Sequence, residues 1–269
     1  QLDLYPYGNT ASRNMIVWKD MVYVAADDGN GITATLFSVD VRNPDDLTYV
    51  SRGAYGGHKS NELIVVDDIL YDASWFAFLR IFDVSTPGYF SYVSSFSPAD
   101  GASWKIDVAN DRAYLIESTN TESHGLWIID ISNPSSPSLV SHVFTDARTM
   151  GGVAARGSYV YYGNSNHFEI ANISDEDNPY IVSDINLGFM AGAYAGNINS
   201  VRLRGDYAYI GCEEGTGGLF VFDVSDPTNP VQSGNYTGNG ARDMYLLGDY
   251  AFMAGLGATL NTVDISNPS

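Results

Sequence analysis

The chain has 269 residues, of which 45% are hydrophobic and 13% aromatic, so it can bury a large core without disulfides. Its formal net charge of −19 disfavours nucleic acids and anionic membrane surfaces as partners, because both are negatively charged. The single cysteine, Cys212, excludes an internal disulfide, and no apolar run reaches the ~18 residues of a membrane span.

An apolar strand followed by a polar turn recurs along the chain. Its clearest copy runs from Leu219 to Pro227 and reads Leu-Phe-Val-Phe-Asp-Val-Ser-Asp-Pro. Each copy has an acidic or amide anchor after the apolar run, at Asp40, Asp83, Asp130, Asn172, Asp223 and Asp264. Successive anchors are 41 to 51 residues apart, and a strand-built period of ~40–50 residues is typical of a β-propeller.

Each repeat contains segments rich in aromatic and β-branched residues, which favour strands. In the first three repeats we expect strands at 14–18, 21–26, 35–41, 47–54, 62–66, 69–74, 78–84, 89–96, 104–108, 112–117, 125–131 and 138–144. In the last three we expect them at 151–155, 159–163, 167–173, 180–187, 199–203, 207–212, 218–224, 231–236, 242–247, 250–254 and 258–265. The sixth repeat therefore ends before a fourth strand.

The N-terminus offers the missing strand. The spacing from Asp264 to the C-terminus and on from Gln1 to Asp40 also falls within 41 to 51 residues, so the repeats keep phase across the chain ends. The sequence therefore predicts an all-β fold, a six-bladed β-propeller of four-stranded antiparallel blades. We expect one domain over residues 1–269, with the last blade closed by an N-terminal strand at residues 2–7.

The turns have their own signatures. Between the first two strands of each repeat lie tight hairpin pairs: Lys19-Asp20, Asp67-Asp68, Asn110-Asp111, Gly157-Ser158, Gly205-Asp206 and Gly248-Asp249. After the third strand, we expect the anchor side chain to accept the backbone N–H two residues on. Asn172 and Glu176 depart from this pattern and predict a looser turn in the fourth repeat. Asn261 and Thr262 predict a less buried third strand in the sixth.

These repeats resemble the LVIVD-repeat β-propeller family. The resemblance rests on Gly205-Asp206-Tyr207-Ala208-Tyr209-Ile210, on the Leu219 to Pro227 copy, and on Leu126-Trp127-Ile128-Ile129-Asp130-Ile131-Ser132-Asn133-Pro134. It extends over essentially the whole chain. The resemblance implies an extracellular or cell-surface binding or scaffold propeller with no assigned chemistry.

The loops before each first strand are expected to surround the mouth of a central channel. At the start of the first strand of each repeat, and at the same height along the channel axis, we expect Arg13, Asn61, Trp104, Gly151, Asn199 and Arg242. Arg148 lies in an equivalent loop. The arginines predict an anion site, unless each pairs with a local carboxylate such as Asp243 or Asp146. Trp104 predicts stacking on a sugar or aromatic ligand, unless it fills the channel. The apolar loop 188–198 is either a lid or a plug.

No residue pattern predicts a cofactor. His58, His124 and His167 lie near one face, but they differ in distance from the axis, and His142 lies in an outer strand, so we expect no histidine metal site. Residues 27–31 lack the acidic spacing of a calcium loop, although incidental calcium remains compatible with so acidic a surface. Cys212 is expected to be a small buried hydrophobe and not a nucleophile.

Function is less constrained than fold. The leading interpretation is a non-enzymatic, extracellular or cell-surface protein that binds a protein or glycan through the loop face, without nucleic acid binding or membrane insertion. It would be a monomer or part of a larger surface protein. The alternative is a hydrolase or lyase with a channel-mouth site formed by Arg13, Arg242, Glu62 and His58. A third possibility is a structural piece of a larger surface assembly.

Overall fold

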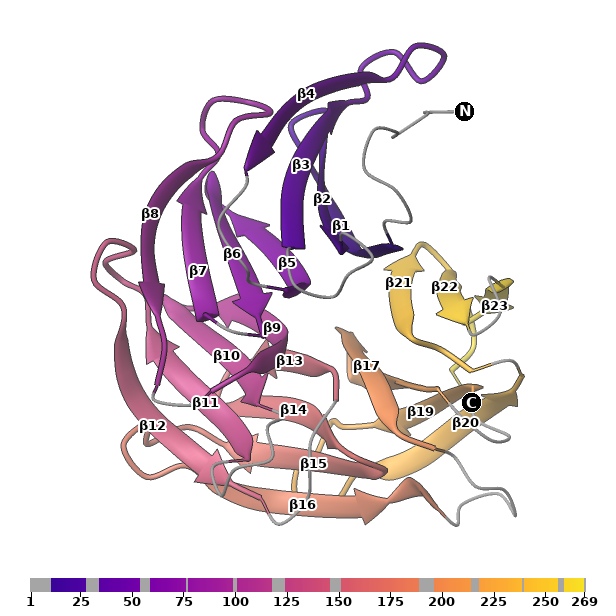
Figure 1. Cartoon of the computed structure of the whole chain (residues 1–269). Helices are drawn as coiled ribbons and strands as arrows, with labels where there is room; N and C mark the ends of the chain where they lie inside the picture. The colour runs from indigo at the N-terminus through magenta and orange to yellow at the C-terminus, as the bar shows by residue number, and fades with distance from the viewer. Residues whose placement is uncertain are drawn as a thin grey trace. The chain divides into compact units, whose positions relative to one another are not determined.

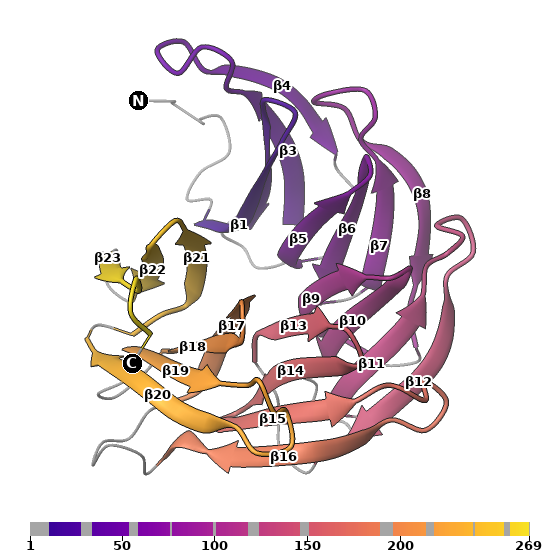
Figure 2. The same cartoon turned by 180° about the vertical axis from the view of Figure 1, so that it is seen from behind.

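The structure is a computed structural model that describes most of the chain. The described residues are 11–27, 34–53, 59–75, 77–98, 101–117, 124–145, 151–188, 196–213, 218–238, 240–255 and 259–268, with the backbone alone at 11–13, 27, 34 and 35. Within these ranges the regular elements are β-strands, arranged in six antiparallel sheets (Figures 1 and 2). No helix in this part of the chain is long and apolar enough to cross a membrane.

The fold is a six-bladed β-propeller, and we number the sheets as blades 1–6 in chain order. Blades 1 to 3 consist of β1 Ala11–Trp18, β2 Met21–Asp27, β3 Ala34–Asp40 and β4 Thr48–Gly53; β5 Ser60–Val66, β6 Ile69–Ser74, β7 Phe78–Asp83 and β8 Ser91–Phe96; β9 Ser103–Ala109, β10 Arg112–Glu117, β11 Gly125–Asp130 and β12 Ser138–Phe144. Blades 4 to 6 consist of β13 Val153–Arg156, β14 Tyr159–Asn164, β15 His167–Asn172 and β16 Tyr180–Asn186; β17 Ile198–Arg204, β18 Tyr207–Cys212, β19 Gly218–Asp223 and β20 Val231–Thr237; β21 Asp243–Leu247, β22 Tyr250–Gly255 and β23 Thr259–Asp264.

The predicted repeats are confirmed, with strand ends shifted by a few residues. Five blades have four strands in sequential order, and the described part of blade 6 has three. The predicted closing strand at residues 2–7 lies outside the described residues, so it stays a prediction.

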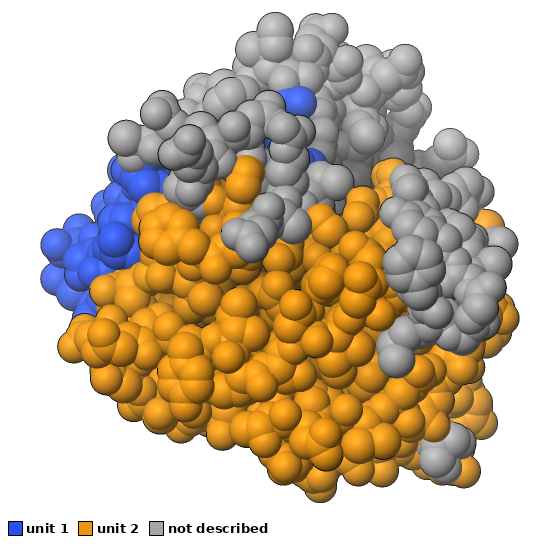
Figure 3. Space-filling view, turned by 90° about the horizontal axis from the view of Figure 1, so that it is seen from below, with its two compact units in different colours: residues 1–113, 129–139 blue, residues 114–128, 140–269 orange. Residues whose placement is uncertain are grey.

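Two compact units divide the chain (Figure 3). Unit 1 comprises residues 1–113 and 129–139, and unit 2 comprises residues 114–128 and 140–269. Blades 1 and 2 belong to unit 1, blades 4 to 6 belong to unit 2, and the strands of blade 3 are divided between the units.

The hairpins between the first and second strands use two kinds of tight turn. In blades 1 to 3 both turn residues have positive φ, with values of 53° and 60° at Asn110 and Asp111. In blades 4 to 6 only the leading glycine does, as at Gly205 with φ of 54°. The first pattern is that of a type I′ turn, and the second fits a type II′ turn. Both turn types match the right-handed twist of paired strands, although they use different residues.

The anchor prediction is confirmed in all six repeats. The side-chain oxygen of each anchor accepts the N–H two residues on, over 2.7–3.0 Å, at Asp40, Asp83, Asp130, Asn172, Asp223 and Asp264. The looser turn predicted for blade 4 is wrong. The side-chain oxygen of Asn172 accepts the N–H of Ser174 at 2.8 Å, and that of Asp175 accepts the N–H of Asp177 at 3.2 Å. The turn is kept because an amide oxygen accepts this hydrogen bond as a carboxylate does, and because the proline absent from this repeat would donate no hydrogen bond.

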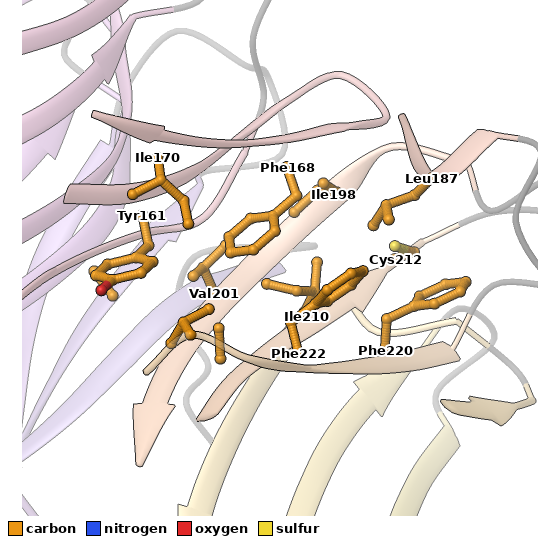
Figure 4. Packing of buried hydrophobic residues seen from close by; sticks show 13 residues of the cluster. Tyr161, Phe168, Ile170, Leu187, Ile198, Val201, Ile210, Cys212, Phe220 and Phe222 are labelled. Atoms are coloured by element: carbon orange, nitrogen blue, oxygen red, sulfur yellow. The ribbon is translucent and has the colours of Figure 1, made fainter. Parts of the chain in front are cut away.

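Neighbouring blades within a unit pack face to face through apolar side chains. In unit 2, Phe168 of blade 4 lies against Phe222 of blade 5, with ring centroids 5.5 Å apart (Figure 4). The side chains of Ile198, Val201 and Ile210 complete this layer. In unit 1, the corresponding layer joins the β2–β3 face of blade 1 to Leu63, Leu70 and Phe82 of blade 2. Alternate strand positions therefore bury one complete face against the next repeat.

Blade 6 buries one of its faces and exposes the other. Met244 and Met253 pack against blade 5, whereas Tyr245 and Leu260 on the opposite face are 66% and 71% exposed. The prediction of a less buried third strand is confirmed: β23 alternates between half-buried and exposed residues, while β7, β11 and β19 are almost wholly buried.

Candidate functional site

The predicted ligand-binding residues lie at one end of the blades, which we call the loop end. It is the end at which the second strand joins the third, opposite to the anchor turns. Asn61 and Trp104 belong to unit 1, and Asn199 and Arg242 belong to unit 2. The side chain of Arg13 and the whole of Arg148, like His58 and most of the predicted lid 188–198, lie outside the described residues.

In unit 1, two tryptophans meet at the loop end. Trp104 lies near the start of β9, and Trp75 follows β6. Their ring centroids are 5.0 Å apart, and the ring planes meet at 78°, which is an edge-to-face contact. Both side chains are half-buried. Asn61 is buried next to Trp104, and its amide Nδ2 donates to the carbonyl of Ser103 at 2.8 Å. Trp75 was missed in the sequence, because a single tryptophan in a short loop gives no repeat signal.

Ser103 holds the Trp75 loop in place. Its hydroxyl accepts the N–H of Ser74 at 3.0 Å and donates to the carbonyl of Phe78, so it ties both ends of the loop together. The N–H of Trp75 donates to the carbonyl of Lys59 at 2.7 Å. Phe78 has a φ of 55°, a strained value for a bulky residue that the surrounding contacts maintain. The tryptophan pair is therefore presented on a rigid support.

Glu62, the carboxylate of the predicted hydrolase site, links two blades. It is buried, and its Oε2 accepts the N–H of Ile106 at 2.9 Å, while Oε1 lies 3.5 Å from Nζ of Lys105. Asn14 has the same position in blade 1 and accepts the N–H of Leu63 at 3.1 Å. In blade 4 the position is Gly152, where an added Cβ would lie 2.2 Å from the N of Val201. This position of the repeat therefore contacts the backbone of the next blade.

In unit 2, Asn199 and Arg242 converge on Glu213. Nδ2 of Asn199 donates to Oε2 at 2.7 Å, and Nε of Arg242 donates to Oε1. Arg242 remains 63% exposed along its side chain. The expected partner of Arg242, Asp243, instead pairs with Arg202 at 3.0 Å. A carboxylate near Arg242 thus neutralises its charge, but this carboxylate is Glu213 and not the expected Asp243.

Three consecutive blades, 2 to 4, form buried polar interactions at a position where blades 1 and 5 have phenylalanine. The position three residues before the anchor is Phe37, Arg80, Trp127, Glu169, Phe220 and Asn261 in blades 1 to 6. Arg80 pairs with the fully buried Asp72, Trp127 donates from Nε1 to Glu117 at 2.7 Å, and Glu169 accepts from Asn164 at 2.7 Å. Burial raises the pKa of Asp72 to about 6, despite Arg80. Comparing this one position across the six repeats would have revealed these groups in the sequence.

The histidines do not form one centre in the described part of the chain. His142 stacks on Trp127 at 4.3 Å, and burial lowers its pKa to about 4. Nδ1 of His167 lies 2.6 Å from Oδ1 of Asp184. Within the described ranges no group of three or more His, Cys, Asp or Glu side chains could hold a metal ion. Cys212 is fully buried, which confirms the prediction of a small buried hydrophobe, and desolvation raises the pKa of its thiol to about 12.

Comparison with known proteins supports the fold and the repeats. The LVIVD repeat model matches residues 100–145, 195–238 and 238–269. A comparison with curated protein sequences gives no match.

Among solved structures, the chain is similar to a putative 6-phosphogluconolactonase from Bacteroides uniformis, with 14% identity and a TM-score of 0.75, over 94% of this chain and 80% of that one. It is also similar to a chain of the mitotic checkpoint complex, with 12% identity and a TM-score of 0.75, over 96% and 77%. A third similar structure is an ancestral GH74 enzyme, with 12% identity and a TM-score of 0.68, over 97% and 43%. At these identities the likeness concerns the fold alone. The chain is a six-bladed β-propeller of the LVIVD-repeat family.

Proposed function

We propose that the protein is a non-enzymatic binding protein that acts outside the cell or at its surface and recognises a glycan through the loop end of unit 1. The observation that carries the proposal is the tryptophan pair, Trp75 and Trp104, fixed by Ser103. The face of an indole ring packs against the C–H groups of a sugar ring, and a rigid support lowers the entropy lost on binding.

A polar group beside the tryptophans supports the same proposal. Asn61 donates its N–H to Ser103, and its Oδ1 is buried without a hydrogen-bond partner among the described residues. The hydrogen bond of this buried amide to Ser103 fixes the backbone next to Trp104, and so helps to hold the indole in position. The charge of −19 and the scarcity of lysine suit a saline or extracellular setting, where ions screen the repulsion.

The alternative of a hydrolase or lyase has weaker support. Its carboxylate, Glu62, is engaged with the backbone of Ile106 and with Lys105. The similar structures include a putative lactonase and a GH74 enzyme, but their low identity carries no catalytic residue to this chain.

A glycan array tests the proposal and separates binding from turnover. We expect the wild-type protein to retain a defined group of glycans, and mass spectrometry to recover them unchanged. Trp104→Ala and Trp75→Ala should reduce retention, whereas Trp18→Phe should not, since Trp18 lies at the opposite end of blade 1 and donates to Asp68. Cleavage that disappears in Glu62→Gln would instead establish the hydrolase. Retention of no glycan would contradict the proposed ligand class.

A further inference from the structure

Lys59 lies beside the tryptophan pair at the loop end of unit 1. The N–H of Trp75 donates to the carbonyl of Lys59 at 2.7 Å, and the adjacent residues Ser60 and Ser74 are partners in the β5–β6 register. Residues directly opposite each other in an antiparallel pair have their side chains on the same face, with Cβ atoms ~4.5–5.5 Å apart. The side chain of Lys59 therefore lies on the face of blade 2 from which Trp75 contacts Trp104.

The side chains next to Lys59 in the chain support this orientation. The hydroxyl of Ser60 donates to Asp72 at 3.1 Å and accepts from Arg80 at 2.9 Å, so Ser60 lies on the face that carries this buried ion pair. Strand alternation then places Lys59 on the opposite face. Glu62, which accepts a backbone N–H of blade 3, lies on that face too. Lys59 is thus on the side of blade 2 that meets blade 3.

The lysines differ in their ion pairs. The chain has three, and two of them, Lys59 and Lys105, are at this site. Nζ of Lys105 lies 3.5 Å from Glu62, and that of Lys19, at the opposite end of blade 1, lies 2.7 Å from Asp68. Among the described residues no carboxylate pairs with Lys59, whose side chain is half-buried. Lys59 therefore places a positive charge next to two indole rings in a protein of net charge −19.

We propose that this site takes an acidic glycan, whose carboxylate or sulfate group binds Lys59 while a sugar ring packs against the tryptophan pair. The inference rests on the proposed glycan site and specifies its ligand class. An ammonium group is a point charge with three N–H donors, which suits the oxygens of either anion. The negative charge of the rest of the protein does not prevent this contact, because physiological salt screens exposed charges beyond ~8 Å.

Glycans that differ only in charge test the proposal. The array holds oligouronates, sialylated oligosaccharides and sulfated galactans, each beside its carboxyl-reduced or desulfated form. Isothermal titration calorimetry in ~0.15 M sodium chloride then compares the two members of each retained pair. We expect the acidic member of at least one pair to bind about fivefold more tightly than its neutral partner, the scale of one exposed ion pair. The pair that shows this preference identifies the anion.

Variants of the lysines assign the preference to one side chain. Lys59→Gln should remove the preference but bind the neutral member as wild type does, which also shows that the variant is folded. Lys59→Arg keeps the charge and should keep the preference. Lys19→Gln is the matched control, because it removes a lysine that is paired with Asp68 at the opposite end of blade 1.

The outcomes separate this inference from the proposed function. Equal binding of both members of each pair, with both weakened in Trp104→Ala, would overturn the acidic ligand but leave the glycan site. A preference that persists in Lys59→Gln would also overturn the inference, because another group would then bind the anion. Retention of no glycan would overturn the proposed function and this inference with it.

A measurement on wild type decides the point if Lys59→Gln fails to fold. Reductive methylation with a carbon-13 label gives each of the three lysines its own NMR signal. The acidic glycan should shift the signal of Lys59, which is identified as the one missing from Lys59→Arg, and leave the signal of Lys19 in place. An unchanged Lys59 signal at saturating glycan would overturn the proposal.

Discussion

At the residue scale, the anchors show how one side chain fixes a turn. Hydrogen bonds from the side chain and from the backbone N–H of Ser225, the latter over 2.9 Å, hold the pKa of Asp223 below its usual value. A carboxyl group with a lowered pKa stabilises the fold above its unfolded pKa, and this contribution is lost as the pH falls through the folded value. The five aspartate anchors thus add to the acid sensitivity of the protein.

Asparagine should replace an aspartate anchor better than alanine does. Asn172 makes the same turn with an amide oxygen, at 2.8 Å from the N of Ser174. We expect Asp223→Ala to lower the unfolding midpoint at pH 7 by a few degrees, and Asp223→Asn to lower it much less. Differential scanning calorimetry of both variants provides the measurement. Equal losses would mean that the charge, and not the hydrogen bond, holds the turn.

Some contacts of single residues could be predicted from the sequence, and others could not. The anchors were predictable because the repeat places the same acceptor two residues before the same donor. The partner of Arg242 was not, because Glu213 lies 29 residues away and follows the strand of another blade. Trp75 meets Trp104 for a similar reason: the contact joins two blades and leaves no local pattern. Contacts between repeats therefore cannot be predicted from the sequence of each repeat alone.

At the scale of elements, the hairpins of the two halves of the chain differ in backbone conformation. Asp111 is in the left-handed region with φ of 60°, whereas Asp206, at the same place in blade 5, is not among the described residues with positive φ. Strand positions were predictable from apolar alternation, but the turn types depend on this conformational difference between similar residue pairs.

Glycine should therefore have opposite effects at these two positions. Asp111→Gly relieves a left-handed non-glycine residue, and we expect it to raise the free energy of unfolding by up to about 1 kcal/mol. Asp206→Gly only adds freedom to the unfolded chain, and we expect a loss of about 0.5–1 kcal/mol. Denaturant unfolding of the two matched variants decides the point. Changes of the same sign in the free energy of unfolding of the two variants would contradict this difference between the turns.

At the scale of the whole molecule, the sequence predicts the number of blades better than the function. Six anchors in phase are enough to predict six blades, because each repeat needs a neighbour to bury its apolar face. Among the described residues of unit 2, blade 6 leaves Tyr245 and Leu260 exposed on one of its faces. The predicted pairing of residues 2–7 with blade 6 stays a prediction.

The function could be predicted only to the level of a binding propeller. The positions that distinguish one blade from another, such as Glu62, Arg80 and Glu169, are mostly occupied in linking strands and blades. In unit 1 the tryptophan pair is the candidate contact for a ligand. Only the structure identifies Trp75 as the partner of Trp104. We therefore propose that a ligand binds through Trp75 and Trp104.

The most direct test is isothermal titration calorimetry of a glycan retained on the array, with wild type and Trp104→Ala. We expect Trp104→Ala to weaken binding at least about tenfold, the effect of losing one aromatic contact of about 1.4 kcal/mol. Equal dissociation constants for the two proteins would contradict the claim.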